Sequence, residues 1–305
     1  MTRLDAGGLR FNVERLDGQG APGAGGRETV VLVHGIATDN LTSYYFTVAP
    51  VFAAAGYDVV MYDQRGHGRT TRPPHGYRIE QFSGDLALLL DELGVAGPVH
   101  LVGNSFGGTV ALDYALHHPG RVASVLIVES EPPTEAWARK MSGLLAGSAY
   151  QLHDERTLPW IEETYGRHEA RLVRWSMRLL HGTSIAEDIA ASRIPDEAAW
   201  RSLAVPVLAV YGANSDLADM AGWLRGLLPH CRTHAVQGHG HSVLVGTPET
   251  VGPLLLEWVR EGHKQLIGDP VELGESHEEP GERQEELREG RDPAPAGLHA
   301  GVPTP

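Results

Sequence analysis

The amino-acid sequence predicts an α/β protein built on a doubly wound, mostly parallel sheet with an inserted helical cap. Short apolar runs of strand length recur along the chain, and segments with helical spacing separate them. From about residue 132 to residue 200 this alternation stops, and helical patterns follow one another without a clear strand. Strands that alternate with helices form a parallel sheet covered on both faces, so the helical stretch indicates an insertion.

The predicted strands are compact apolar runs, as is typical of buried parallel strands. They are expected at residues 9–16, 29–34, 57–63, 98–104, 122–129 and 205–212. Helical spacing is expected at residues 44–55, 79–93, 106–117 and 217–228. The chain therefore divides into one core in two parts, residues 1–131 and 201–262, with the cap at residues 132–200 between them.

The predicted cap is rich in aromatic side chains. It holds four of the six tryptophans, together with two tyrosines: Trp137, Trp160, Trp175, Trp200, Tyr150 and Tyr165. Some of these rings pack the cap helices together. As a group they favour an apolar pocket, because ligand cavities are lined largely by aromatic and aliphatic groups. We therefore expect a bulky apolar or cyclic small molecule as the ligand.

The last segment, residues 263–305, changes in composition to Glu, Pro and Gly with few bulky apolar residues. Counting from Glu261, it carries eleven acidic and four basic side chains, a net charge of −7. Such a composition predicts a disordered, solvated tail. A solvated terminus is favoured over a docking role.

Composition and charge exclude several classes of function. The formal net charge of −14 gives no electrostatic footprint for nucleic acid or an anionic membrane. No stretch approaches the roughly 20 apolar residues that span a bilayer. Cys231 is the only cysteine, which excludes an intramolecular disulfide and a cysteine-built metal site. The first residues lack the apolar core of a secretory signal, so we expect a cytoplasmic protein that acts on a small molecule; oligomeric state is not indicated.

The segment VHLVGNSFGGTVALDYAL predicts a nucleophilic serine at Ser105. Gly103, Ser105 and Gly107 form a G-x-S-x-G pattern between an apolar strand and an amphipathic helix. In such a turn the serine hydroxyl is held at the N-terminus of the helix, where N–H groups favour developing negative charge. A bare G-x-S-x-G is common, but one in this context is specific.

A serine hydroxyl is a weak nucleophile, so it needs a base and an acid that orients the base. Asp216 is the predicted acid, because it follows a buried strand by a short turn. Its alternative role is to cap the helix that begins near Leu217. Asp219 lies too far into that helix to be preferred. Glu129 and Glu131, which follow the preceding strand, are the alternative positions for the acid.

His241 is the predicted base, with His239 on the same loop as its competitor. Histidine suits the role because its pKa lies near neutral pH, so it can take the serine proton and return it to a leaving group. A His-x-His pair can also bind a metal, but no third ligand of clear spacing accompanies it. We therefore expect no metal and no organic cofactor.

The oxyanion hole requires two backbone donors. The N–H of Phe106, directly after Ser105, is the first. The segment VVLVHGIATDN offers the second, since Gly35 allows a sharp turn that can leave the N–H of Ile36 pointing into the site. His34 is interpreted as a structural residue of this turn, not as a second base.

Together these motifs resemble the α/β-hydrolase superfamily, in particular its capped esterase, lipase-like and C–C hydrolase branches. Five motifs stand in the order of that family, over about residues 25–262. They are HGI, DQRGHGRT, GNSFGG, the Asp of YGANSD and the GHGHS turn. The resemblance implies Ser105 as nucleophile, Asp216 as acid, His241 as base, and Ile36 and Phe106 as oxyanion donors. It also favours His241 over His239, because the family base follows a glycine in a GxGH turn.

The resemblance also ranks the possible reactions. Haloalkane dehalogenases and epoxide hydrolases of this fold carry Asp as the nucleophile in the turn where this chain has Ser105. The serine therefore argues against both. The GNSFGG segment around Ser105 is similar to the nucleophile turn of C–C hydrolases. Their Gly/Pro-rich loop after the first HG and the Trp after their catalytic histidine are missing, because ATDN and Ser242 stand in those places. Hydrolysis of an ester, thioester or lactone is the leading hypothesis. C–C bond hydrolysis, acyl transfer by the same triad, and a receptor-like binding protein with slow turnover are the alternatives.

Overall fold

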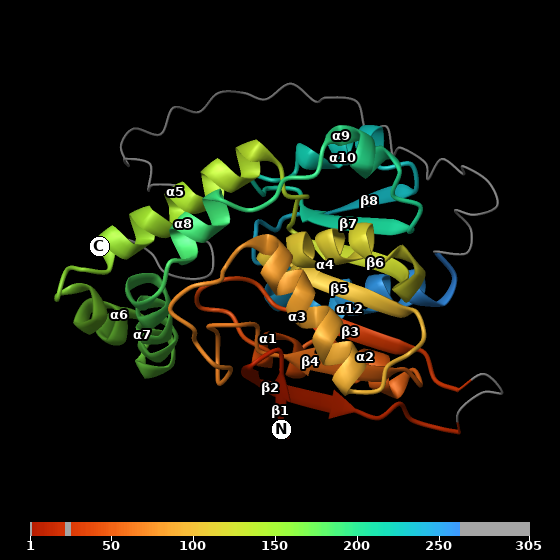
Figure 1. Cartoon of the computed structure of the whole chain (residues 1–305), viewed down its shortest axis with the longest axis horizontal. Coiled ribbons are helices and arrows are strands. Elements are labelled where there is room, and N and C mark those ends of the chain that lie inside the picture. The colour runs from red at the N-terminus through yellow and green to blue at the C-terminus, as the bar shows by residue number, and fades with distance from the viewer. Residues whose placement is uncertain (1, 22–25, 263–305) are drawn as a thin grey trace.

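The apolar runs pair into one eight-stranded sheet in the computed structural model, which describes residues 2–21 and 26–262 (Figure 1). The strands are β1 (Thr2–Ala6), β2 (Leu9–Leu16), β3 (Thr29–Val33), β4 (Asp58–Tyr62), β5 (Val99–Asn104), β6 (Val122–Val128), β7 (Val207–Gly212) and β8 (Cys231–Val236). Their order is β1-β2-β4-β3-β5-β6-β7-β8. The pairs of β2 with β1 and with β4 are antiparallel, and β3 to β8 run parallel. The predicted doubly wound, mostly parallel sheet is confirmed.

The register of the central strands brings their carboxyl ends together. Val33 lies opposite Gly103, and Asn104 lies opposite Val128. The Ser105 N–H continues this ladder by donating to the Val128 carbonyl at 2.8 Å. The residues that follow β3, β5 and β6 therefore meet at one edge of the sheet, where a parallel α/β sheet places its ligands.

Helices cover both faces of the sheet and bury its alternating side chains in two apolar clusters. On one face lie α3 (Ile79–Glu92), α4 (Phe106–His117) and α10 (Met220–Leu227). On the other lie α1 (Thr42–Tyr45), α2 (Ala49–Ala54), α11 (Val243–Gly246), α12 (Pro248–Glu257) and the π-helical turn η2 (Trp258–Gly262). A short 3₁₀ turn, η1 (Pro119–Arg121), precedes β6.

Five helices lie between β6 and β7, and this insertion extends beyond the carboxyl edge of the sheet (Figure 1). They are α5 (Glu135–Gln151), α6 (Thr157–Tyr165), α7 (Arg167–Gly182), α8 (Ile185–Ala190) and α9 (Glu197–Arg201). Asp188 of α8 fixes this insertion to the core, because its carboxylate accepts the N–H groups of Gly76 at 2.8 Å and Tyr77 at 3.0 Å. That the insertion acts as a cap with boundaries at residues 132 and 200 stays a prediction.

Differences from the predicted elements fall at the edges of the sheet. β1 and β8 are missing from the predicted strands, and both are edge strands whose side chains are largely exposed or half-buried. Edge strands need no continuous apolar run, so their sequences give a weak signal. The predicted helix at 44–55 is two short helices, α1 and α2. The predicted disordered tail at residues 263–305 lies outside the described residues.

Glycine at position 107 is predicted to be required for folding, because a Cβ there would lie 1.9 Å from the Val33 carbonyl oxygen. Gly107→Ala should lower the free energy of unfolding by more than about 3 kcal/mol or prevent folding, since the clash is with backbone. Gly143→Ala is the matched control: nothing lies within 4 Å of its added Cβ on α5, and alanine favours a helix by about 1 kcal/mol. Chemical denaturation of both variants makes the comparison. Equal stability of the Gly107 variant and the wild type would show that this packing is wrong.

Candidate active site

Ser105 lies on a strained turn between β5 and α4, as the sequence predicts. Its φ of 51° and ψ of −123° lie where side chains are rarely found. The close packing of strand and helix explains why the flanking residues are glycines: a Cβ on Gly103 would lie 2.4 Å from the Gly107 carbonyl oxygen. The turn leaves the serine side chain partly exposed at the N-terminus of α4.

The His241 ring reaches Ser105, whereas His239 does not. His241 Nε2 lies 3.3 Å from Ser105 Oγ. The backbone carbonyl of His239 instead accepts the Asn214 N–H at 2.9 Å, which fixes the loop. Of the two histidines that the sequence offers, the structure brings His241 to the serine.

Glu129 is the carboxylate that contacts the other side of the His241 ring. Its Oε2 accepts from His241 Nδ1 at 3.0 Å and from the Ser215 hydroxyl at 2.5 Å. Its Oε1 accepts the Gly212 N–H. The Glu129 side chain is fully buried, and three donors satisfy it, as a buried carboxylate requires. With Nδ1–H donated to Glu129, Nε2 is left as the acceptor that faces the serine hydroxyl.

The sequence predicts Asp216 as the acid that orients His241, and the structure corrects this prediction. His241 pairs with Glu129 and not with Asp216. Asp216 is exposed at the surface. The side chain of the residue before it, Ser215, reaches Glu129. Because Ser105 pairs beside the end of β6, a carboxylate directly after β6 lies next to the nucleophile. The second alternative, Glu131, forms an ion pair with Lys140 on α5.

The backbone at Glu129 is strained like that at Ser105. Ala37, Ser105 and Glu129 are the three non-glycine residues with positive φ in the part of the chain that the structure describes. All three lie at the carboxyl ends of neighbouring strands. Such strain persists only where the surrounding structure enforces it, and it concentrates at functional sites.

The loop after β3 presents the N–H of Ile36 as a free donor. The N–H before it, on Gly35, donates to Asp39 Oδ2 at 2.6 Å, and the N–H after it, on Ala37, donates to His67 Nε2 at 3.0 Å. Neither the Ile36 N–H nor the Phe106 N–H donates to any of the residues that the structure describes. Both expected oxyanion donors are therefore available.

The predicted structural role of His34 agrees with its contacts. Its Nε2 accepts the Gln64 N–H at 2.9 Å, and the Gln64 side chain donates back to the His34 carbonyl at 2.6 Å. The His34 and His67 rings meet edge to face, with centroids 5.2 Å apart. The ring of His34 thus fixes the turn after β3 against the DQRGHGRT segment.

Two aromatic side chains pack against Phe106, the residue directly after Ser105. Trp137 of α5 stacks on Phe106 with ring centroids 6.2 Å apart, and Phe82 of α3 meets Phe106 at 4.8 Å. Of the other aromatic residues of the insertion, Trp200 is buried, and Tyr150 is 82% exposed. One of the predicted pocket aromatics, Trp137, therefore lies against a residue of the site.

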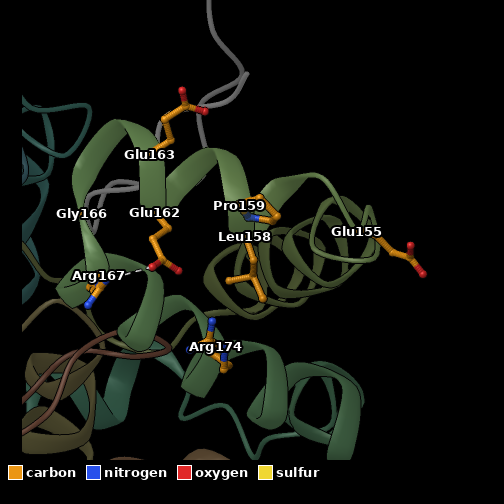
Figure 2. A pocket seen from close by; sticks show the side chains of 8 residues that line it. All are labelled: Glu155, Leu158, Pro159, Glu162, Glu163, Gly166, Arg167 and Arg174. Carbon is orange, nitrogen blue, oxygen red and sulfur yellow. Dashed lines mark ion pairs between the residues drawn. The ribbon is translucent and has the colours of Figure 1, made fainter.

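The insertion carries a hollow (Figure 2), and none of the site residues described above lines it. It is lined by Glu155, Leu158, Pro159, Glu162, Glu163, Gly166, Arg167 and Arg174. Glu162 and Arg167 form an ion pair at 3.4 Å, and Glu155 and Glu163 point outward (Figure 2). The charged side chains do not converge on one point, so we assign no ligand to this hollow.

Comparison with known proteins decides the family. The sequence model of the family described as "alpha/beta hydrolase fold" matches residues 28–247. The chain belongs to the α/β-hydrolase fold family. The resemblance inferred from the motifs is thereby confirmed. The match extends into both predicted parts of the core.

Proteins similar to this chain differ in the reactions that their names describe. The chain is 29% identical over 231 residues to a non-heme chloroperoxidase of Streptomyces lividans, covering 68% of this chain and 84% of that protein. It is 26% identical to a putative carbamate hydrolase of Pantoea ananatis, covering 81% and 93%. A thermophilic esterase from Thermogutta terrifontis superposes with a TM-score of 0.66 at 21% identity, covering 86% and 100%.

No helix among the described residues of this α/β-hydrolase is long and apolar enough to cross a membrane. The same residues contain no group of three or more His, Cys, Asp or Glu side chains placed to hold a metal ion. Burial raises the pKa of the single cysteine, Cys231, to about 12.

The buried His67 predicts a pH dependence of stability. Burial, with a smaller contribution from His34, lowers the pKa of His67 to about 3, against about 6.5 in an unfolded chain. The unfolded state therefore binds this proton first, so stability is full above pH 6.5 and falls as the pH drops toward 3. Between pH 7 and pH 5 the wild type should lose about 2 kcal/mol more than His67→Leu. Urea denaturation at both pH values measures this, and parallel losses would contradict a neutral His67.

Proposed function

We propose that the protein is a serine hydrolase that cleaves a carboxylic ester, thioester or lactone through an acyl-enzyme. One observation carries the proposal: His241 lies between Ser105 Oγ and Glu129 Oε2, within 3.3 Å and 3.0 Å. A binding protein has no chemical need for a nucleophile, a base and an oriented acid in one line. The family is consistent with hydrolysis, and the ester-like substrate is our inference from the serine.

The acylation step uses each of the three side chains. Ser105 Oγ attacks the carbonyl carbon while His241 Nε2 takes its proton. Glu129 stabilises the imidazolium and keeps Nδ1 protonated, so that Nε2 faces the serine. The tetrahedral intermediate then collapses, and His241 donates the proton to the leaving oxygen or sulfur.

The negative charge of that intermediate falls between two backbone donors. Ile36 N–H and Phe106 N–H both lack an acceptor within the described structure, and the latter begins α4. The helix dipole adds to the donor at Phe106. Donors of this kind each lower the barrier by about 3 kcal/mol in related enzymes. Water then attacks the acyl carbon while His241 Nε2 takes a proton from it. The bond to Ser105 Oγ breaks, His241 returns the proton to Oγ, and the carboxylic acid product leaves.

The composition of the insertion supports an apolar or cyclic substrate. It carries four of the six tryptophans and two tyrosines, and ligand cavities are lined largely by aromatic and aliphatic groups. One of these rings, Trp137, contacts Phe106, the residue directly after Ser105. We propose a small molecule of this kind as the substrate, and a cytoplasmic location for the protein.

The identity of the acid can be tested by matched amide variants. Glu129→Gln should lower kcat for p-nitrophenyl esters by about 10³- to 10⁴-fold, since the amide favours the wrong histidine tautomer. Asp216→Asn makes the same chemical change at an exposed carboxylate and should leave kcat within about twofold. Ser105→Ala sets the background rate, because it removes the nucleophile.

Steady-state kinetics of the four proteins decides between the acids. A large loss in Asp216→Asn together with a small one in Glu129→Gln would reject Glu129. Undiminished turnover in Ser105→Ala would reject the serine mechanism as a whole.

A further inference from the structure

The loop that carries Ile36 is held from both sides by side chains that do not touch the nucleophile. Asp39 closes the loop from within: its Oδ2 accepts the Gly35 N–H at 2.6 Å and its Oδ1 accepts the Asn40 N–H at 2.8 Å. His67 holds it from outside through the Ala37 N–H at 3.0 Å. The donors on either side of Ile36 are thus both engaged.

We propose that Asp39 and His67 are positioning residues that form a clamp, and that this clamp makes the Ile36 N–H the oxyanion donor. The proposal rests on the proposed function of the site. Three consecutive N–H groups follow β3 at this turn, and a loop free to rotate could present any of them. Because Gly35 and Ala37 each donate to a fixed acceptor, the Ile36 N–H between them is the one left to face a substrate.

The strain at Ala37 explains why a clamp is needed. Its φ of 66° is in the left-handed region, which a residue with a Cβ adopts only when its surroundings compensate the cost. The His67 bond is made at this residue. Losing it removes a compensating contact, and the Ile36–Ala37 peptide can then relax to an ordinary conformation that moves the donor.

His67 is itself fixed in the form that the clamp requires. Its Nδ1 lies 2.9 Å from the Arg65 carbonyl, which can only accept, so Nδ1 carries the proton. Nε2 is therefore an acceptor for the Ala37 N–H. Arg65 is in turn held by two bonds to the buried Asp85, at 2.7 Å and 2.5 Å. The clamp is thereby continuous with the core through α3.

The DQRGHGRT segment, which contains His67, also fixes the loop after β3 at Leu41. Asp63 Oδ1 accepts the Leu41 N–H at 3.0 Å, while Asp63 Oδ2 accepts from Asn12 and Arg69 at 2.8 Å each. The DQRGHGRT segment thus meets the loop at His34, Ala37 and Leu41. A residue in this segment can act on the oxyanion donor without contacting the substrate.

Ester kinetics on clamp variants tests the proposal. His67→Leu and Asp39→Ala should each lower kcat by about 10- to 100-fold with KM within about threefold, because a donor displaced by about 1 Å stabilises mainly the transition state less. His67→Gln should retain most of kcat, since its amide oxygen can accept the Ala37 N–H. Inhibition by phenylboronic acid, whose serine adduct is tetrahedral, should weaken by the same factor as kcat falls.

Ser83→Ala is the matched control, because it removes a buried hydrogen bond, to Asp113 at 2.5 Å, between α3 and α4. It should lower stability and leave kcat unchanged. An equal fall of kcat in Ser83→Ala, a change confined to KM, or wild-type kcat in His67→Leu and Asp39→Ala would overturn the clamp.

Hydrogen–deuterium exchange over residues 34–41 tests the clamp without turnover. Exchange should rise in His67→Leu and Asp39→Ala and stay at the wild-type rate in Ser83→Ala. Unchanged exchange in the clamp variants would overturn the proposal even in an active enzyme. If the wild type hydrolyses no ester but the clamp variants still exchange faster than it does, the proposed function is rejected. The role of Asp39 and His67 in holding the loop is then still supported.

Discussion

The close approach of α4 to β3 is the constraint on which the site depends. Gly107 lets the helix backbone pass against the Val33 carbonyl at a distance that no Cβ could occupy. Ser105 can then stand at φ 51° between strand and helix, with the Phe106 N–H free beside it. The loop after β3 lies against the same turn, since a Cβ on Gly35 would be 3.5 Å from that of Ser105. The nucleophile and the Phe106 donor are thus placed by backbone packing.

The supply of the acid from β6 follows from sheet register. Asn104 pairs with Val128, so the next residues of the two strands, Ser105 and Glu129, are neighbours. A positive φ at Glu129 lets the carboxylate reach around to His241 while its other oxygen binds the N–H of Gly212. Ser215 after β7 donates to Glu129, so the β7 turn supports the acid without providing it. The loop that carries His241 contacts the turns after both strands. His241 bonds to Glu129 after β6, and the His239 carbonyl accepts the Asn214 N–H after β7.

Much of this was predictable from the sequence, and the exceptions have physical reasons. Apolar runs and the G-x-S-x-G turn located the central strands, Ser105 and the flanking helix, because burial and glycine packing leave strong local signals. Glu129 was available as an alternative acid. The contact of His241 with Glu129 and not with Asp216 depends on the register of β5 against β6 and on the backbone conformation at Glu129, which involve strands far apart in sequence. The edge strands β1 and β8 lacked an apolar signal, because one side of each is unpaired.

A crystal structure of the protein after reaction with a fluorophosphonate tests whether Ser105, His241 and Glu129 act in line beside the two backbone donors. We expect phosphorus on Ser105 Oγ, the phosphonyl oxygen about 2.7–3.1 Å from the N–H nitrogens of Ile36 and Phe106, and His241 still bonded to Glu129. A folded protein that forms no adduct at Ser105, or an adduct in which His241 turns from Glu129 to Asp216, would contradict it.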